Sequence, residues 1–302
     1  MVFILTYTPA PPALPPVTRV PFRQEWVGWD GSVWDLSTGS RGVLLTLGGL
    51  VGWHMPKFEQ YRSQSRAIPG HRRRGSRALG RNVVWPLFIH GDTTDEWMER
   101  DVDFWRTIHP DLEGVWRVHS PGGTRELRLT GQLDSAHAYP RDPSWDGWAR
   151  YVVELEAAQP YWTGAAVEQQ FVAPNPQDFF GAGAPPFTIS RGATFATAAI
   201  SNPGDVAAYP VWTLVGPLAA VEVGVGSTLI DVPFDVLAGE TLVIDTDPRN
   251  QTATLNGVDA SADLGFQAFA AVEPGQERSL TITATGSGSV SVSLVPLYFR
   301  AF

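Results

Sequence analysis

The run from Ser201 to Pro217 constrains the fold most, because it joins a tight turn to a strand of alternating apolar and polar side chains. In the turn, Pro203 fixes φ and Gly204 is expected to supply a positive φ. The side chains of Asn202 and Asp205 are expected to cap nearby backbone amides. A turn of this kind before an alternating strand is typical of an antiparallel β-sandwich.

The residues after this turn repeat the pattern of short strands and turns. Pro210 restricts Tyr209 to an extended conformation, and the strand from Val211 ends at Gly216-Pro217. Further along come, in order, a strand at 228–232, the sequence LAGETLVIDT at 237–246 with Gly239 as its turn glycine, Asn256-Gly257, and Glu273-Pro274-Gly275. No helix is needed to account for this part of the chain. Gly286 to Ser289 is expected to be a hairpin turn between strands at 280–285 and 290–294.

This order of turn, strand, AGE-x-L-x-IDT, NG and PG resembles the C-terminal domain of siphophage distal tail proteins, the tail-tip hub family. The resemblance is strongest in the C-terminal half and extends more loosely to the N-terminal half. It implies a mostly β protein in which a tail-tube-like N-terminal β-domain closes a sixfold ring around a DNA channel. A galectin-like antiparallel β-sandwich would then project outwards.

Composition divides the 302-residue chain into two domains. Ten of the 12 Trp and all six His precede residue 160. We therefore predict a Pro-rich N-terminal arm at 1–17, a ring-forming β-domain at 18–160 and a sandwich at 161–302. The arm either lies free or packs on a neighbouring subunit. Ten Trp also exceed what one small core comfortably buries, which predicts shared interfaces in a closed ring.

Charge follows the same division. Residues 1–160 carry 18 Lys/Arg and 18 Asp/Glu, whereas residues 161–302 carry 4 and 13, so the formal charge of −9 belongs to the second part. An acidic surface repels phosphates, which makes the second domain a poor DNA-binding module.

The chain contains no Cys, which excludes disulfides and is compatible with assembly in a reducing cytoplasm. The first residues do not have the pattern of a signal peptide, and no segment approaches the ~20 apolar residues of a membrane span. The resemblance implies a place at the tail tip of a virion.

Within the first domain the pattern predicts strands at 23–29, 32–36, 42–47, 53–61, 81–90, on either side of Pro121-Gly122-Gly123, and at 148–158. One amphipathic helix is expected to begin at Thr94 as its N-cap and to end at His109-Pro110. A junction is expected at 160–164, followed by a loop at 174–186.

Catalytic patterns are weak. Glu154 and Glu156 share one face of a strand, as a carboxylate pair of a glycoside hydrolase could, but the polar face of a half-buried strand has the same alternation. The turn at Asp245-Thr246-Asp247 lacks the spacing of a calcium loop. We therefore assign no catalytic, cofactor or metal residues and expect a protein that is not an enzyme.

The main concentration of charge is basic and lies in a Gly- and Ser-containing loop expected at 62–80. Its candidate subunit-contact residues are Arg62, Arg66, Arg72, Arg73, Arg74 and Arg77. Guanidinium groups can pair with carboxylates of an adjacent subunit, attract DNA phosphates, or remain solvated. We favour the subunit contact.

The sequence thus predicts a structural minor tail protein that forms a homohexameric ring between tail tube and tail tip. The resemblance implies the tail tube protein, the tip hub protein and other minor tail proteins as partners, with DNA passing through without sequence-specific binding. The alternative is a carbohydrate-binding module for host attachment, with Trp212, Tyr209 and Phe266 to Phe269 as aromatic candidates. A glycoside hydrolase is the weakest alternative.

Overall fold

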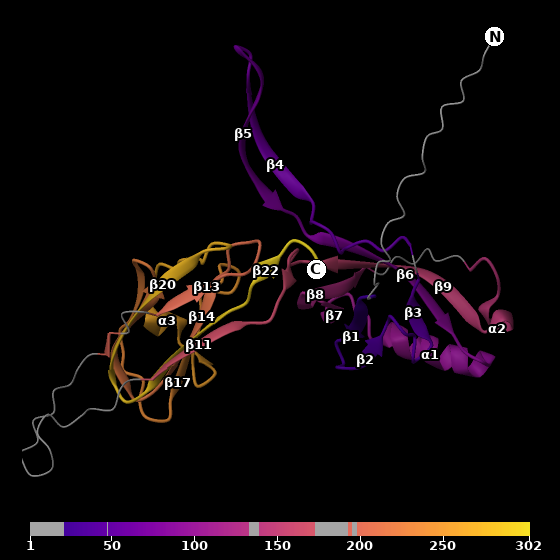
Figure 1. Cartoon of the computed structure of the whole chain (residues 1–302). Helices are drawn as coiled ribbons and strands as arrows, with labels where there is room; N and C mark the ends of the chain where they lie inside the picture. The colour runs from indigo at the N-terminus through magenta and orange to yellow at the C-terminus, as the bar shows by residue number, and fades with distance from the viewer. Residues whose placement is uncertain (1–20, 47, 133–138, 173–192, 195–197) are drawn as a thin grey trace, which may run out of the picture.

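The computed structural model describes residues 21–46, 48–132, 139–172, 193–194 and 198–302. The protein is mostly β with antiparallel sheets, as predicted. Figure 1 shows two lobes joined at a narrow junction, from which a hairpin projects. We call residues 21–163 with 297–302 the first lobe and residues 164–296 the second lobe. The predicted N-terminal arm at 1–17 and the loop at 174–186 lie outside the described residues.

The first lobe is built on one nine-stranded sheet. Its main strands are β1 (Arg23–Val27), β2 (Val33–Asp35), β3 (Val43–Leu45), β6 (Arg81–His90), β7 (Gly114–Ser120), β8 (Gly123–Gln132) and β9 (Trp148–Ala157), in the order β2-β1-β7-β8-β9-β6-β3. Two short strands, β10 (Trp162–Thr163) and β22 (Leu297–Tyr298), join this sheet beside β8. The predicted hairpin around Pro121 to Gly123 is confirmed as β7 and β8.

The amphipathic helix is confirmed as α1 (Thr94–Arg106), but its predicted N-cap was wrong by one residue. Thr93, with an extended backbone, is the cap, and its hydroxyl accepts a hydrogen bond of 3.2 Å from the backbone N–H of Glu96. The helix buries Trp97 and Phe104 in the first core. A second, single-turn helix, α2 (Pro143–Asp146), lies beside α1.

The expectation that this domain cannot bury its tryptophans was largely wrong. The indole rings of Trp26 and Trp116 lie 5.2 and 5.4 Å from Trp85, edge to face, and all three are almost fully buried. Gly114 creates the room, because a Cβ there would lie 2.2 Å from the ring of Trp26. Of the tryptophans among the described residues, only Trp29 and Trp145 are exposed.

The second lobe is an antiparallel β-sandwich around its own hydrophobic core. One sheet has the order β11-β21-β14-β17-β18-β19, with β11 (Val167–Val172), β14 (Pro210–Val215), β17 (Thr241–Asp245), β18 (Thr252–Leu255), β19 (Val258–Asp259) and β21 (Ser289–Leu294). The other contains β12 (Ala193–Thr194), β13 (Ala199–Ser201), β15 (Leu218–Val225), β16 (Thr228–Val232) and β20 (Glu277–Gly286). A single-turn helix, α3 (Ser261–Leu264), also contributes Leu264 to the core.

The expected hairpin at Gly286 to Ser289 was wrong. β20 pairs with β15, whereas β21 pairs with β14, so this turn carries the chain from one sheet of the sandwich to the other. The backbone passes very close to its neighbours here, since a Cβ at Gly286 would lie 2.3 Å from the carbonyl oxygen of Pro217. A hairpin and an inter-sheet turn bury the same alternate residues, so sequence alone does not distinguish them.

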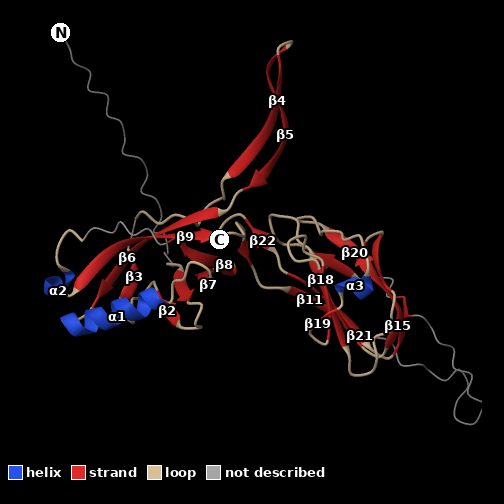
Figure 2. Ribbon diagram, turned by 180° about the vertical axis from the view of Figure 1, so that it is seen from behind, coloured by secondary structure: helices blue, strands red, loops and turns tan. Residues whose placement is uncertain are grey.

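The C-terminal segment returns from the sandwich to the first lobe. Ala301 is fully buried in the first core, and its N–H donates a hydrogen bond of 2.9 Å to the carbonyl oxygen of Trp53. The side chain of Arg125 donates to the carbonyl oxygen of Arg300 at 2.7 Å. Figures 1 and 2 both place the C-terminus at the junction, beside the base of the projecting hairpin.

A buried arginine holds this junction together. Arg81, at the start of β6, is almost fully buried and donates hydrogen bonds to backbone carbonyl oxygens rather than to a carboxylate. The acceptors are the carbonyl oxygens of Pro160, Gly52, His54 and Phe299. Burial lowers the pKa of Arg81 to about 10, so its guanidinium remains charged at neutral pH. One side chain therefore ties the interdomain segment and the C-terminal segment to the first lobe.

Candidate functional site

The most distinctive surface is a β-hairpin formed by β4 (Phe58–Ser65) and β5 (Ile68–Ala78), which we call the basic arm. Figure 1 shows it projecting from the junction, away from both lobes. A two-residue turn, Arg66-Ala67, joins the strands. The segment predicted as a Gly- and Ser-containing loop is thus a hairpin, and β4 belongs to this separate two-stranded sheet rather than to the larger one.

The physical reason for this error is the polarity of the arm. Neither strand faces a core, so the chain shows none of the apolar alternation that identifies a half-buried strand. The twist is also irregular, because the register shifts between Tyr61 and Arg62 and again between Ser63 and Ser65. A Pro69-Gly70 pair, with Gly70 at φ +82°, lies near the tip.

All the arginines singled out in this segment lie on the arm and are exposed: Arg62, Arg66, Arg72, Arg73, Arg74 and Arg77. Arg77 pairs with Glu59 at 2.8 Å. Other arginines of the arm donate to neutral groups, as Arg62 does to Gln60 at 2.7 Å. The arm therefore presents several guanidinium groups with no carboxylate partner among the described residues.

The arm is fixed at its base and unsupported along its length. The N–H of Leu79 donates to the carbonyl oxygen of Lys57 at 2.9 Å, and the ring of Phe58 lies 5.8 Å from that of Phe299. An isolated two-stranded hairpin is only marginally stable in water. A long basic hairpin held at one end is therefore well suited to lie on a second surface.

The predicted turn residues occupy structural positions in the second lobe. Asn202 is buried; its side-chain NH₂ donates to the carbonyl oxygens of Val206 and Val272, both at 2.8 Å, and its oxygen accepts from the N–H of Gly204 at 2.9 Å. Pro203, between Asn202 and Gly204, is exposed. The side chain of Asn202 thus acts as the predicted turn cap and also ties the turn to the distant segment at Val272.

The reason given for Gly204 was wrong. Gly204 does not have a positive φ; instead, a Cβ there would lie 2.6 Å from the carbonyl oxygen of Leu297. Gly239 has φ +86° and open space around it. Asp205 does not cap a local amide, because its carboxylate accepts from the N–H of Phe299 at 3.0 Å. The turn therefore fastens the C-terminal segment to the sandwich.

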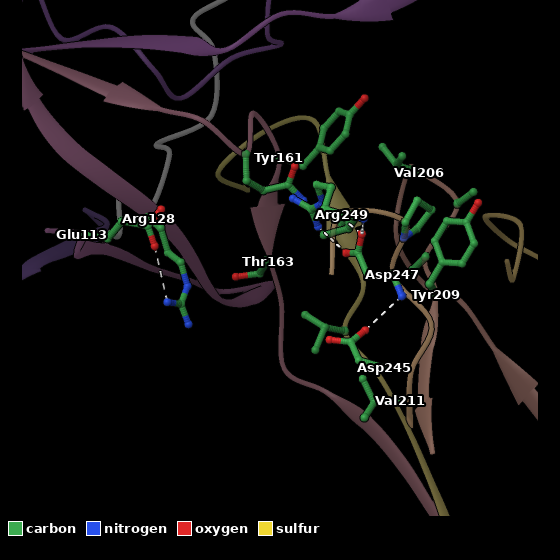
Figure 3. A pocket seen from close by; sticks show the side chains of 16 residues that line it. Glu113, Arg128, Tyr161, Thr163, Val206, Tyr209, Val211, Asp245, Asp247 and Arg249 are labelled. Atoms are coloured by element: carbon green, nitrogen blue, oxygen red, sulfur yellow. Dashed lines mark hydrogen bonds and ion pairs between the residues drawn. The ribbon is translucent and has the colours of Figure 1, made fainter. Parts of the chain in front are cut away.

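A cleft of about 590 Å³ lies between the lobes, and sequence reasoning did not identify it. Figure 3 shows Arg249 and Asp247 close to Tyr161, with Tyr209 on the sandwich side. The Arg249 side chain lowers the pKa of Asp247 through its hydrogen bonds, and Asp247 in turn raises the pKa of Arg249. Burial raises the pKa of Tyr161. Asp247 and Arg249 thus neutralise each other within one turn of the second lobe.

Glu154 and Glu156, the carboxylate pair considered for a glycoside hydrolase, lie on β9. Glu154 is exposed, and Glu156 accepts a hydrogen bond of 2.9 Å from the side chain of Gln132. No group of three or more metal-ligating side chains occurs in the described ranges. The turn at Asp245 binds its own backbone, with the N–H of Asp247 donating to the Asp245 carboxylate at 2.9 Å. In the part of the chain that the structure describes, no helix is long and apolar enough to cross a membrane.

Comparisons with known proteins support the fold but not a family assignment. No protein-family model matches the chain, and no curated protein matches it. The Dit protein of phage SPP1, described as a paradigm of the hub adsorption apparatus in phages that infect Gram-positive bacteria, has a TM-score of 0.63 at 15% identity, covering 91% of this chain and 98% of that one.

Two structures of the phage p2 baseplate in its activated conformation are also similar. The one with calcium has a TM-score of 0.50 at 12% identity, covering 92% of this chain and 98% of that one. The one with strontium has a TM-score of 0.52 at 14% identity, covering 91% and 98%. The chain therefore has, across both lobes, the fold of phage tail hub and baseplate proteins.

Proposed function

We propose that this chain is a structural minor tail protein of a long non-contractile phage tail, of the distal tail type. The observation that carries this proposal is the similarity to the SPP1 Dit protein, which covers 91% of this chain, and therefore both lobes, and 98% of that chain. A shared two-lobed architecture of this extent supports a shared place in the tail tip. Its role is assembly rather than catalysis.

The proposed assembly is a homohexameric ring that joins the tail tube to the tail tip and surrounds the DNA channel. The first lobe would close the ring, because its sheet ends in strands β2 and β3, and open sheet edges are safest when a neighbour covers them. Closed cyclic symmetry gives each copy the same two contacts. The sixfold order rests on the resemblance to distal tail proteins.

The proposed partners are other copies of the chain, the tail tube protein, the tip hub protein and other minor tail proteins. DNA would pass through the channel without sequence-specific binding. The protein would be part of the virion, at the tail tip, after assembly in the host cytoplasm. Within the ring the basic arm would make subunit contacts through its arginines.

Carbohydrate binding by the second lobe is the less favoured alternative. Trp212 is fully buried in the sandwich core, so its ring offers no surface to a sugar. Tyr209 lines the cleft and Phe266 is fully exposed, but they are separate features. Glycoside hydrolysis is weaker still, because Glu156 is engaged by Gln132.

The decisive experiment is electron microscopy of virions whose genome encodes this chain. Antibodies raised against the purified protein should label the tail tip, and class averages should show a ring of six copies around an open channel with the sandwiches outside. Labelling of capsids alone, or no labelling of purified virions, would contradict the proposal.

A further inference from the structure

The basic arm contains two arginines that lie directly opposite each other. Arg62 on β4 and Arg73 on β5 are cross-strand partners, so their side chains share one face of the hairpin. Arg62 donates to Gln60, and Arg73 donates to Ser76 at 3.0 Å, so neither has an acidic partner among the described residues. Like charges in this position destabilise a strand pair. The arm would therefore gain stability from an anionic group placed over this face.

The second lobe contains the opposite arrangement. Glu222 on β15 and Asp231 on β16 are also direct cross-strand partners. Both are exposed, and neither carboxylate forms an ion pair within the described ranges. Their neighbours Val221 and Val232 point into the sandwich core, so the two carboxylates share the outer face. The exposure of both side chains shows that this face of the sheet is accessible.

These two like-charge pairs do not meet within one copy. Figure 2 shows the arm leaving the junction, whereas β15 lies at the far end of the second lobe. A carboxylate pair that would accept the arginines of the arm must therefore belong to another molecule. Charge favours this match more widely, because residues 161–302 carry 13 acidic and only 4 basic residues.

We propose that the basic arm of one copy lies on the outer face of β15 and β16 of an adjacent copy, where Arg62 and Arg73 pair with Glu222 and Asp231. This inference rests on the proposed ring, since it needs copies held side by side. Each guanidinium presents a planar fork that fits a carboxylate through two hydrogen bonds. The contact would offset the repulsion between Arg62 and Arg73 and that between Glu222 and Asp231 at the same time.

The favoured occupant is a protein carboxylate surface rather than the phosphates of a nucleic acid. Apart from the imidazole of His71, the exposed part of the arm offers one aromatic ring for stacking on bases, that of Tyr61, and this residue lies nearer the base of the arm than its tip. The acidic face is part of the same chain and would be present in equal number to the arms. Phosphate binding is retained as an outcome of the test.

Cross-linking tests the contact, because the chain has no native Cys. Ser76→Cys places a thiol beside Arg73, and Leu229→Cys places one on the face of Asp231, so all four charges are kept. The matched control partner is Val258→Cys, an exposed apolar residue in the other sheet. In mixtures of two purified full-length single-Cys proteins, the Ser76→Cys and Leu229→Cys pair should form the mixed disulfide several times faster than the control pair. Equal rates would overturn the proposal.

Charge reversal makes the test specific. Reversing Arg62 and Arg73 to Glu, or Glu222 and Asp231 to Arg, should each slow this cross-link on the order of tenfold, and combining all four reversals should restore it. A control that exchanges Glu59 and Arg77 keeps the net charge of the arm and should leave the rate unchanged. Failure of the combined variant to recover would refute the pairing.

The outcomes also separate this inference from the proposed function. A tail-tip ring seen by microscopy together with equal cross-linking rates would reject the arm contact and leave the proposed function in place. Equal rates together with duplex DNA binding that is lost on reversal of Arg62 and Arg73 would assign the arm to phosphates instead. Specific cross-linking by a protein absent from tail tips would keep the contact and remove the tail role.

Discussion

The guanidinium of Arg81 donates a hydrogen bond of 2.8 Å to the carbonyl oxygen of Phe299, a residue 218 positions further along the chain. The same side chain also binds the carbonyl oxygen of Pro160 at 2.7 Å. Phe299 in turn packs on Phe58, the first residue of the basic arm. The base of the arm, the interdomain segment and the C-terminal segment therefore meet in one place. The relative position of arm and lobes is thus set by the buried arginine and its carbonyl partners.

Replacing Arg81 with Lys should therefore destabilise the protein. An ammonium group cannot reach carbonyl oxygens that lie in several directions, so some of them would be left buried without donors. We expect a loss of about 2–4 kcal/mol in the free energy of unfolding, measured by urea denaturation. The exposed Arg77→Lys, as a control, should cost less than about 0.5 kcal/mol. A loss at Arg81 no larger than that of the control would contradict this account of the junction.

Two glycines of the second lobe should respond to alanine for different reasons. In Gly204→Ala the new Cβ meets the backbone of Leu297, so the turn must move, at a cost of about 1–3 kcal/mol. In Gly239→Ala the space is open and only the positive φ is unfavourable, at about 1 kcal/mol. Thermal unfolding should show the larger fall in melting temperature for Gly204→Ala. The reverse order would show that the close approach to Leu297 is not rigid.

The pair of Asp247 and Arg249 predicts a pH dependence of stability. Hydrogen bonds from Arg249 lower the pKa of Asp247 below its ordinary value of 3.8, so the folded state binds fewer protons there than the unfolded state does. This contribution is present at pH values above 3.8 and is lost as pH falls through the folded pKa. Asp247→Asn should therefore be less stable than the wild type at pH 7, and the two should converge in acid below pH 3.8. Urea denaturation across this range measures the difference, and a constant difference would exclude the pair as its cause.

Neutralising part of the basic arm should affect assembly more than folding. Changing Arg72, Arg73 and Arg74 together to Gln removes exposed charges that contact no core, so the free energy of unfolding should change by less than about 0.5 kcal/mol. Incorporation into tail-tip rings, counted by electron microscopy, should fall. The control variant, which changes Arg106, Arg128 and Arg141 to Gln, alters the net charge equally on the body of the first lobe. Equal incorporation of both variants would remove the assembly role of the arm.

The proposed conduit role predicts weak and non-specific binding to duplex DNA. The arm attracts phosphates, but no part of the described chain resembles a base-reading element, and the second lobe is acidic. Filter binding should show an affinity that is the same for unrelated sequences and that falls steeply with salt. Tight binding that persists at high salt would argue against a channel through which DNA slides.

Local sequence patterns determined much of the secondary structure. The turn around Asn202, the helix at 94–106 and the paired strands on either side of residues 121–123 follow from turn residues, capping and periodicity, which act over a few positions. Glu154 lies on the polar face of β9, which was the interpretation preferred to a catalytic pair. Composition also gave the acidic character of the second part of the chain.

Several features depended on contacts between distant residues, which local patterns do not encode. The basic arm has no buried face, so its strands lacked the alternation by which strands are recognised, and the turn after β20 connects two sheets because of how those sheets stack. At Gly204 a Cβ would meet the backbone of Leu297, and Gly114 leaves room for the buried ring of Trp26. The sequence by itself determined elements and charge. Only the tertiary structure decided that the arm stands free, that the C-terminus returns to Arg81, and which charged residues lie opposite each other, because each of these depends on the register and packing of segments far apart in the chain.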